Sequence, residues 1–233
     1  MNIHSIKDSM SRRGVSVTIG ELAYRAANKV TDVRILCAMT LTPTTIDPAF
    51  LEDSAGMTWG FLDEEYLVRA LDQGADADMD RDFIRNALAK GDRCYGALDD
   101  DGGAGRIAAY GWYSTRPTMV TDGLELRFDD DWAYMYKGYT LPAYRGRRLH
   151  GLAMARAMRA YVEEGKKGLV SYVDATNEAS LKSCRRMGYQ DLGHLAAAKI
   201  AGRWVTHAAK SCAPFGLALA ETSEPASPIL AAA

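Results

Sequence analysis

The feature that most constrains this 233-residue chain is an arginine-rich turn between two segments of different periodicity. The turn, residues 141–151, reads LPAYRGRRLHG, with an alternating aromatic run before it and a helical apolar pattern after it. Pro142 cannot donate to a β-ladder and disfavours helix at Leu141, so a strand over 132–140 should end there. Gly146 loosens the turn, and a helix should begin near Leu149.

The start of that helix predicts a binding site for a compact anion. The first four amides of a helix have no internal partner and carry the positive end of its dipole, which makes them a ready phosphate site. Arg145, Arg147 and Arg148 would reinforce the attraction. The turn alone leaves one alternative open, a solvated basic loop that caps a helix.

Composition indicates a globular protein whose positive charge is local to the turn. With 48% apolar and 25% charged residues, the chain can bury an ordinary core, as one large domain or two small ones. Its formal net charge of −2 offers no overall attraction to nucleic acid or to an acidic membrane. The sequence has no apolar leader and no run of about 18 apolar residues, so we expect a soluble protein without membrane contact.

Cysteine and histidine spacing argue against a metal site. The four cysteines show no CxxC spacing, and the four histidines form no HxxxH pair. We therefore expect reduced thiols, a cytoplasmic location and no bound metal.

The chain before the turn divides into an N-terminal extension, 1–30, and a body that begins with a strand. The extension holds a short helical pattern over 19–30, to which we assign no role. The patterns then predict a strand over 33–39, a loop over 41–59, helices over 63–71 and 81–88, a hairpin of 93–98 and 106–113 about the turn 99–103, and strands over 124–128 and 132–140. Alternation in the last strand predicts one shared face for Trp132, Tyr134, Tyr136, Gly138 and Thr140.

The chain after the turn alternates helix and strand before ending in a hairpin. We expect a helix to about 164, a strand over 168–173, a helix from Asn177 to Met187, and a hairpin of 189–200 and 203–208. A right-handed crossover would make the 168–173 strand parallel to the 132–140 strand. From residue 211 Ala, Ser and Pro dominate, which predicts a disordered tail over 211–233.

Two motifs in this order resemble the GNAT superfamily of acyl-CoA-dependent N-acetyltransferases. The family's turn reads approximately V-x-P-x-[YW]-R-G-[RK]-G-[IL]-G, and residues 140–150 read TLPAYRGRRLH. A second signature, N-x-x-[AS] closed by an aromatic-glycine pair, matches 177–180 with 187–189. The resemblance covers about 33–208. It implies an α/β (α+β) GNAT fold over 31–210, with a mixed central sheet of about six to seven strands, splayed central parallel strands and flanking helices.

The resemblance also implies how acetyl-CoA, or another acyl-CoA, would bind as co-substrate. The pantetheine arm would meet Gly138, Tyr139 and Thr140 in the gap between the splayed strands, and Asn177 would meet it near the thioester. The pyrophosphate would meet Arg145, Gly146, Arg147, Arg148, Leu149 and His150. The family's two later glycines are Arg148 and His150 here, and positive φ at such a residue costs about 1–2 kcal/mol. Helical angles would avoid that cost.

The resemblance leaves the catalytic groups open. The family's tyrosine that protonates the departing thiolate falls on Cys184, whose thiol could act with help from Arg185 and Arg186, or could be a buried structural group. The position of a glutamate base in some relatives is Tyr172 here, so that glutamate is missing. The candidate bases, for each of which a structural role is the alternative, are Glu125, Asp131, Tyr134 and Tyr136.

The predicted function is therefore that of an N-acetyltransferase. It would move an acyl group from acyl-CoA to a primary amine of a small molecule, peptide or protein, by direct attack in a ternary complex. A longer acyl chain or a hydroxyl acceptor is a near alternative, and a non-catalytic CoA-binding or regulatory module is one from another class. A nucleic-acid patch is disfavoured, because the arginines lack interleaved aromatic residues and a basic net charge. A homodimer is left open.

Overall fold

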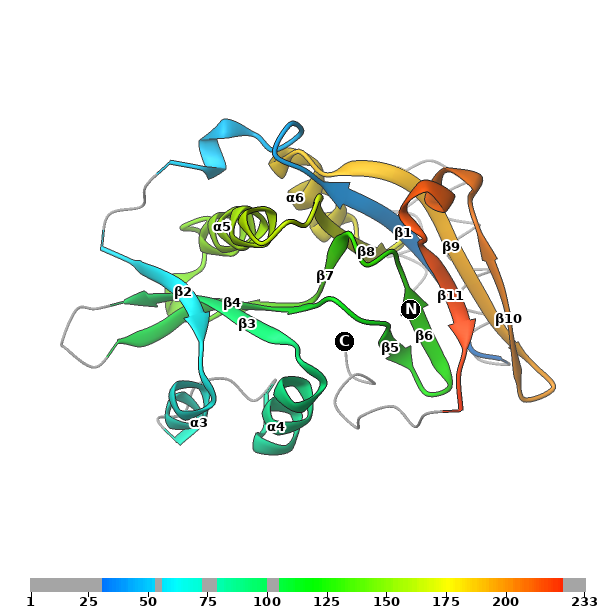
Figure 1. Cartoon of the computed structure of the whole chain (residues 1–233), viewed down its shortest axis with the longest axis horizontal. Coiled ribbons are helices and arrows are strands. Elements are labelled where there is room, and N and C mark those ends of the chain that lie inside the picture. Colours follow the sequence, from blue (N-terminus) through cyan, green and yellow to red (C-terminus); the bar gives the residue numbers. More distant parts are fainter. Residues whose placement is uncertain (1–30, 53–55, 73–78, 100–104, 224–233) are drawn as a thin grey trace, which may run out of the picture.

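The structure is a computed structural model, and it describes residues 31–52, 56–72, 79–99 and 105–223. The helix predicted over 19–30 and most of the turn predicted over 99–103 lie outside these residues. Within them, an eight-stranded sheet crosses the molecule and carries helices on both faces (Figure 1).

The eight strands follow the order β10-β9-β1-β8-β7-β4-β3-β2. Their bounds are β1 Val33–Leu41, β2 Thr58–Leu62, β3 Arg93–Asp99, β4 Arg106–Ser114, β7 Trp132–Thr140, β8 Gly168–Asp174, β9 Gln190–Ile200 and β10 Arg203–Ala208. This mixed sheet with flanking helices confirms the predicted α/β class. The main sheet has one strand more than expected. The extra strand is β2, which begins inside the predicted loop 41–59 and pairs with β3 at the edge of the sheet.

Helices cover both faces of the sheet in the places where the sequence predicted them. On one face lie α5 (Leu149–Glu163) and α6 (Glu178–Met187), and on the other lie α3 (Glu64–Asp72) and α4 (Arg81–Lys90) (Figure 1). Local capping sets their starts. The Asp80 carboxylate, for example, accepts a hydrogen bond from the amide of Phe83 at 2.7 Å, which satisfies one of the free amides of α4.

A second, three-stranded sheet packs on the same face as α3 and α4. It consists of β5 (Thr118–Thr121), β6 (Leu124–Arg127) and β11 (Ala218–Glu221), in the order β11-β6-β5. The strand predicted over 124–128 therefore belongs to this sheet and not to the main one. Its apolar side chains share a core with Trp132 and Tyr134 of β7.

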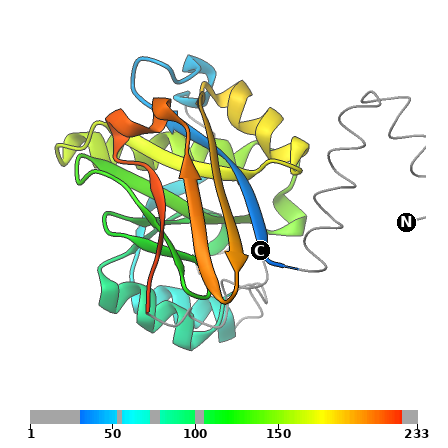
Figure 2. The same cartoon turned by 90° about the vertical axis from the view of Figure 1, so that its right-hand side faces the viewer.

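The prediction of a disordered tail from residue 211 is wrong as far as residue 221. A 3₁₀-helix over Lys210–Phe215 follows the hairpin, and β11 follows the helix. Leu217 and Leu219 are buried, because residues two apart on an extended segment face the same side. Figure 2 shows β11 beside β10, and the amide of Trp204 on β10 donates a hydrogen bond to the Glu221 carboxylate at 3.1 Å. Residues 224–233 lie outside the described part.

The central strands β7 and β8 are parallel only at their first residues. Trp132, Ala133 and Tyr134 lie opposite residues 168–170, and the register ends there. At the point of separation, the Ser171 hydroxyl donates a hydrogen bond to the Met135 carbonyl at 2.9 Å. The parallel pairing and the splay of these strands are both confirmed.

A β-bulge at Tyr136 changes which face each residue of β7 presents. Trp112 of β4 lies opposite Lys137, and Tyr113 lies opposite Met135, so Tyr136 is an extra residue in β7. Before the bulge, Tyr134 faces the second sheet. After the bulge, Gly138 lies against a side chain of α5 on the other face. The prediction of one shared face over the whole strand is therefore wrong beyond Tyr136.

Candidate active site

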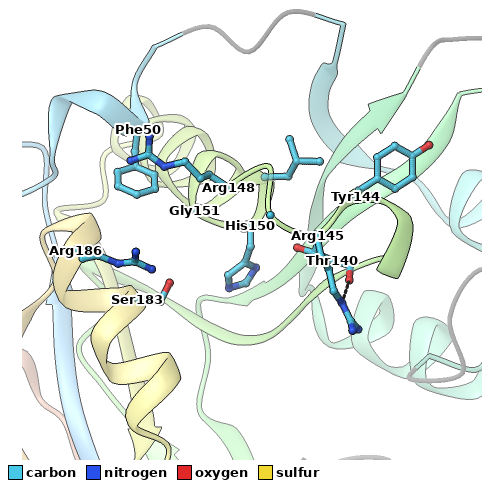
Figure 3. Close-up of a pocket in the computed structure, with 11 residues that line it drawn as sticks. Phe50, Thr140, Tyr144, Arg145, Arg148, His150, Gly151, Ser183 and Arg186 are labelled. Carbon is cyan, nitrogen blue, oxygen red and sulfur yellow. Dashed lines mark hydrogen bonds between the residues drawn. The ribbon is translucent and has the colours of Figure 1, made fainter.

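A cavity of about 230 Å³ lies where the arginine-rich turn meets α5 and α6 (Figure 3). Its walls come from four parts of the chain: a 3₁₀-helix over Pro48–Phe50, the end of β7 with the turn, the first turn of α5, and α6. The lining residues are Phe50, Thr140, Tyr144, Arg145, Gly146, Arg148, Leu149, His150, Gly151, Ser183 and Arg186.

The turn has the conformation needed to open a helix at Leu149, as predicted. A 3₁₀-helix over Pro142–Tyr144 follows the strand, and Gly146 has φ of 81°. Arg148 is the N-cap residue of α5 and has φ of 62°, in the left-handed region. The possibility that this position keeps helical angles is therefore wrong for Arg148, which carries the cost of about 1–2 kcal/mol for a residue with a Cβ.

The cavity presents cations and helix amides to whatever enters it. The Arg148 guanidinium carbon lies 4.9 Å from the centroid of the Phe50 ring. The Arg145 Nη2 donates a hydrogen bond to the Tyr139 hydroxyl at 3.3 Å, and Arg186 approaches from α6. The first amides of α5 point out of the helix start, where they have no intrahelical partner. This donor set fits a phosphate or diphosphate group.

The imidazole of His150 lies deep in the site, between Ser183 and Thr140 (Figure 3). Its ring faces Gly138 of β7 closely enough that a Cβ on Gly138 would lie 2.2 Å from Cε1. Burial lowers the pKa of His150 to about 4, so the ring is neutral at physiological pH. A neutral imidazole can both donate and accept a hydrogen bond.

The structure brings together six of the residues predicted to bind the co-substrate. They are Thr140, Arg145, Gly146, Arg148, Leu149 and His150. The other four predicted residues do not line the cavity. Gly138 is exposed and lies against the His150 ring, and the Tyr139 ring packs on the α3 and α4 side. Arg147 is exposed above the Tyr144 ring, and the Asn177 side chain caps α6 by accepting a hydrogen bond from the Ser180 amide at 3.1 Å.

Cys184 does not line the cavity, although its neighbour Ser183 does. Its side chain is half-buried and packs against the core beneath α5. Burial raises the pKa of the Cys184 thiol to about 11, and the positive charge of Arg185 opposes this only weakly. Arg185 is instead paired with Asp191 at 3.0 Å. Burial therefore outweighs the lowering of the Cys184 pKa by Arg185.

The candidate carboxylate bases lie in ion pairs away from the cavity lining. Glu125 on β6 accepts from Arg127 Nε at 2.7 Å. Asp131, before β7, pairs with Lys167 at 2.6 Å, and that contact lowers the pKa of its carboxyl.

The candidate tyrosine bases Tyr134 and Tyr136, and Tyr172 at the position of the missing glutamate, are on the opposite side of the sheet from the cavity. Tyr134 and Tyr172 belong to the core shared with the second sheet, and Tyr136 stands at its border. Burial raises the pKa of all three phenols, and for Tyr136 the neighbouring Asp92 raises it further. A tyrosine of this kind keeps its proton and is a poor base.

Sequence reasoning missed the parts of the cavity that come from outside the turn. Ser183 and Arg186 are three residues apart on α6, so helical periodicity could have placed them on one face beside the second motif. Phe50 comes from a segment read as loop, and nothing in its sequence pattern points to the site. Gly151 must stay small, since a Cβ there would lie 2.5 Å from the Phe50 ring.

Two general properties limit the kinds of site that the described residues can form. No helix among them is long and apolar enough to cross a membrane. In the same part of the chain, no three His, Cys, Asp or Glu side chains gather in a way that could hold a metal ion.

The model of the Acetyltransferase (GNAT) family matches residues 58–189, which is more than half of the chain. The chain therefore belongs to the GNAT acetyltransferase family, as its two motifs indicated. Membership implies acetyl-CoA as the co-substrate. No curated protein matches the chain.

Solved structures with a similar fold come from the same family. A GCN5-related N-acetyltransferase from Sphaerobacter thermophilus has a TM-score of 0.50 at 16% identity, over 82% of this chain and 55% of that one. A putative GNAT acetyltransferase from Novosphingobium aromaticivorans has a TM-score of 0.47 at 18% identity, over 72% and 64%. An aminoglycoside acetyltransferase from a soil metagenomic sample, in complex with sisomicin, has a TM-score of 0.39 at 13% identity, over 57% and 87%. The chain thus spans less than two thirds of the first two proteins.

Proposed function

We propose that the chain transfers an acetyl group from acetyl-CoA to a primary amine of a small molecule or peptide, by direct attack of the amine within a ternary complex. The observation that carries this proposal is the cavity at the start of α5, whose lining includes Arg145, Arg148 and Arg186 beside the first turn of the helix, where the amides have no intrahelical partner. Each charge-assisted hydrogen bond to a diphosphate would contribute about 1.5–3 kcal/mol, so a few of them suffice for capture.

The open edge of β7 supports the path of the donor's arm. Beyond Tyr134 the strand leaves the register of β8, and its last residues lead directly into the cavity at Thr140. An extended chain of amides such as pantetheine could pair with this edge as an added strand. Its thioester would then lie near the bulge, where strand amides could position and polarise the carbonyl.

Cys184 is retained in this proposal as the candidate acid for the departing thiolate. Its raised pKa means that the thiol carries a proton at neutral pH, which an acid needs. Its distance from the cavity lining means that it would have to act through Ser183 or a water molecule.

The first experiment is a calorimetric titration of acetyl-CoA and CoA into the wild-type protein and into Arg148→Glu/Arg186→Glu. We expect saturable binding by the wild type and loss of at least about tenfold in affinity in the variant, since each reversal replaces an attraction by a repulsion. Arg159→Glu, an exposed reversal further along α5, is the matched control and should bind normally. Binding that survives in the double variant would count against the cavity as the phosphate site.

The second experiment follows thiol release from acetyl-CoA in the presence of primary amines. The panel consists of spermidine, sisomicin and a lysine-containing peptide, with glycerol as a hydroxyl acceptor and octanoyl-CoA as a longer donor. Amine-dependent thiol release supports the acetyltransferase, and preference for octanoyl-CoA would indicate a long-chain enzyme. Tight binding without thiol release from any pair would favour a non-catalytic CoA-binding module.

A further inference from the structure

Tyr136 stands at a junction of three structural features. It is the bulge residue of β7, two positions after the last residue paired with β8. Its partly exposed ring borders both the core beneath the second sheet and the core beneath α3 and α4. The cavity with the arginines lies at the start of α5, and α5 covers the other face of the sheet (Figure 1). A donor arm that enters the gap from the α5 side would therefore leave the Tyr136 side free for a second substrate.

The hydroxyl of Tyr136 is held in one direction by a buried carboxylate. It donates a hydrogen bond to Asp92 Oδ2 at 2.8 Å, and Lys90 Nζ lies 2.9 Å from the same oxygen. The Asp92 side chain is 2% exposed. Lys90 is fixed in turn by donating to the Thr118 hydroxyl of β5 at 3.0 Å. The Asp92 carboxylate thus lies against both the Tyr136 hydroxyl and the Lys90 ammonium, and it is the acceptor of the hydrogen bond from Tyr136.

The fixed proton gives the outward side of Tyr136 a definite polarity. Since its single hydrogen is directed to Asp92, the phenolic oxygen presents only lone pairs to any other neighbour. A ligand beside it must therefore bring an N–H or O–H donor. A carboxylate or a phosphate would instead place acceptor oxygens against the phenolic lone pairs.

The surrounding rings add a preference for positive charge. Tyr134 and Tyr172 stack with centroids 5.9 Å apart, and the Tyr136 ring lies 5.8 Å from that of Tyr134. The Lys90 ammonium already lies 5.5 Å from the Tyr136 centroid, which shows that the ring face accepts a cation. Cation–π attraction distinguishes a basic amine from an alcohol, although both can donate a hydrogen bond.

We propose that Tyr136, positioned by Asp92, receives an N–H of the acceptor, and that the acceptor is a basic primary amine. This inference rests on the proposed acetyl transfer and names the group that orients its second substrate. A basic amine arrives as an ammonium and must lose one proton to water before it attacks. The neutral amine then donates one N–H to the Tyr136 oxygen and keeps its lone pair free to face the thioester. Asp92 is a positioning residue, because it acts through Tyr136 and is too buried to touch the substrate.

The test compares Tyr136→Phe and Asp92→Asn with the wild type, using acetyl-CoA and the panel of spermidine, sisomicin and lysine peptide. Tyr136→Phe removes one oxygen and keeps the ring, so it remains informative if Asp92→Asn fails to fold. We expect both variants to raise the KM for the amine by about tenfold or more, as loss of a hydrogen bond to a charged group predicts. The Kd for acetyl-CoA should stay within about twofold, because the donor binds on the other face.

Glu164→Gln is the matched control. It breaks the 2.7 Å ion pair on the surface between Glu164 and Arg93, the residue that follows Asp92 in the sequence. It should leave both KM and Kd unchanged. An unchanged amine KM in Tyr136→Phe would overturn the inference, and so would wild-type protein that binds acetyl-CoA but neither acetylates nor binds any amine of the panel. A wild type that does not bind acetyl-CoA at all would instead overturn the proposed function on which the inference rests.

Discussion

The imidazole of His150, in the first turn of α5, lies directly over Gly138 of β7. A Cβ built on Gly138 would stand 2.2 Å from Cε1 of the ring and 3.0 Å from Nδ1, closer than such atoms approach in proteins. The two residues therefore depend on each other. A large side chain at 150 is compatible with the fold only because 138 has none.

We expect Gly138→Ala to lower the free energy of unfolding by about 1–3 kcal/mol, the usual cost of overpacking. His150→Ala removes the ring, so the double variant should recover part of that loss. Chemical denaturation of the four proteins of this double-mutant cycle measures the coupling, which should be at least about 0.5 kcal/mol. Strictly additive effects would mean that the ring moves aside without cost.

Substitutions at Arg148 should separate its backbone strain from its charge. Arg148→Gly and Arg148→Ala both remove the guanidinium and its contact with Phe50, but only glycine adopts φ near 62° without strain. We expect the glycine variant to be more stable than the alanine variant by about 1 kcal/mol, as the left-handed region predicts. Both should bind CoA equally weakly. The denaturation midpoint and a calorimetric titration of each variant check the two statements.

The pH dependence of Cys184 alkylation should reveal its raised pKa. An unfolded cysteine ionises near 9, whereas burial raises the pKa of this thiol to about 11. The neutral thiol is therefore favoured by folding, and this contribution to stability is complete below pH 9 and is lost as the pH rises towards 11. Alkylation by iodoacetamide should be slow at pH 8 and should rise steeply above pH 10. A plateau reached by pH 8 would contradict the raised pKa.

Thiol release by Cys184→Ser gives the separate test of its proposed catalytic role. Serine is a far weaker acid than a thiol, so turnover should fall by about tenfold or more if Cys184 protonates the departing thiolate. An unchanged rate would leave Cys184 as a packing residue of α6.

Truncation should show that the segment after the last hairpin is part of the core. Ending the chain at residue 209 removes Leu217 and Leu219, each of which contributes about 1.5–3 kcal/mol when fully buried. We expect a loss of about 3–6 kcal/mol in the free energy of unfolding, measured by denaturation. A chain ending at residue 223 keeps β11 and should be much less affected. Equal stability of the two truncations would contradict a structural role for β11.

The elements set by local chemistry could be predicted from the sequence. Pro142 and Gly146 determine the turn through their own backbone preferences, and the helix begins at Leu149 as those preferences indicated. The cavity at the start of α5 followed in part, because seven of its lining residues belong to the continuous motif at 140–150.

The features that depend on distant partners could not be predicted. No glycine or proline marks the bulge at Tyr136, which exists because β7 must match β4 on one side while leaving β8 on the other. Phe50 reaches the cavity only through the packing of α5 against its short helix. The link from Asp92 to Tyr136 joins residues 44 positions apart, and neither position carries a signal in its own sequence.

Because of the bulge, the alternation of β7 side chains between the two faces of the sheet reverses at Tyr136. Up to Tyr134, the side chains at even-numbered positions meet the second sheet, whereas after the bulge Gly138 lies against the His150 ring and Thr140 lines the cavity. Removing the extra residue would restore simple alternation and exchange the two sets. One inserted residue thus lets a single strand contribute to the core beneath the second sheet and to the cavity at the start of α5. Substituting every second residue of β7 would therefore disturb both regions.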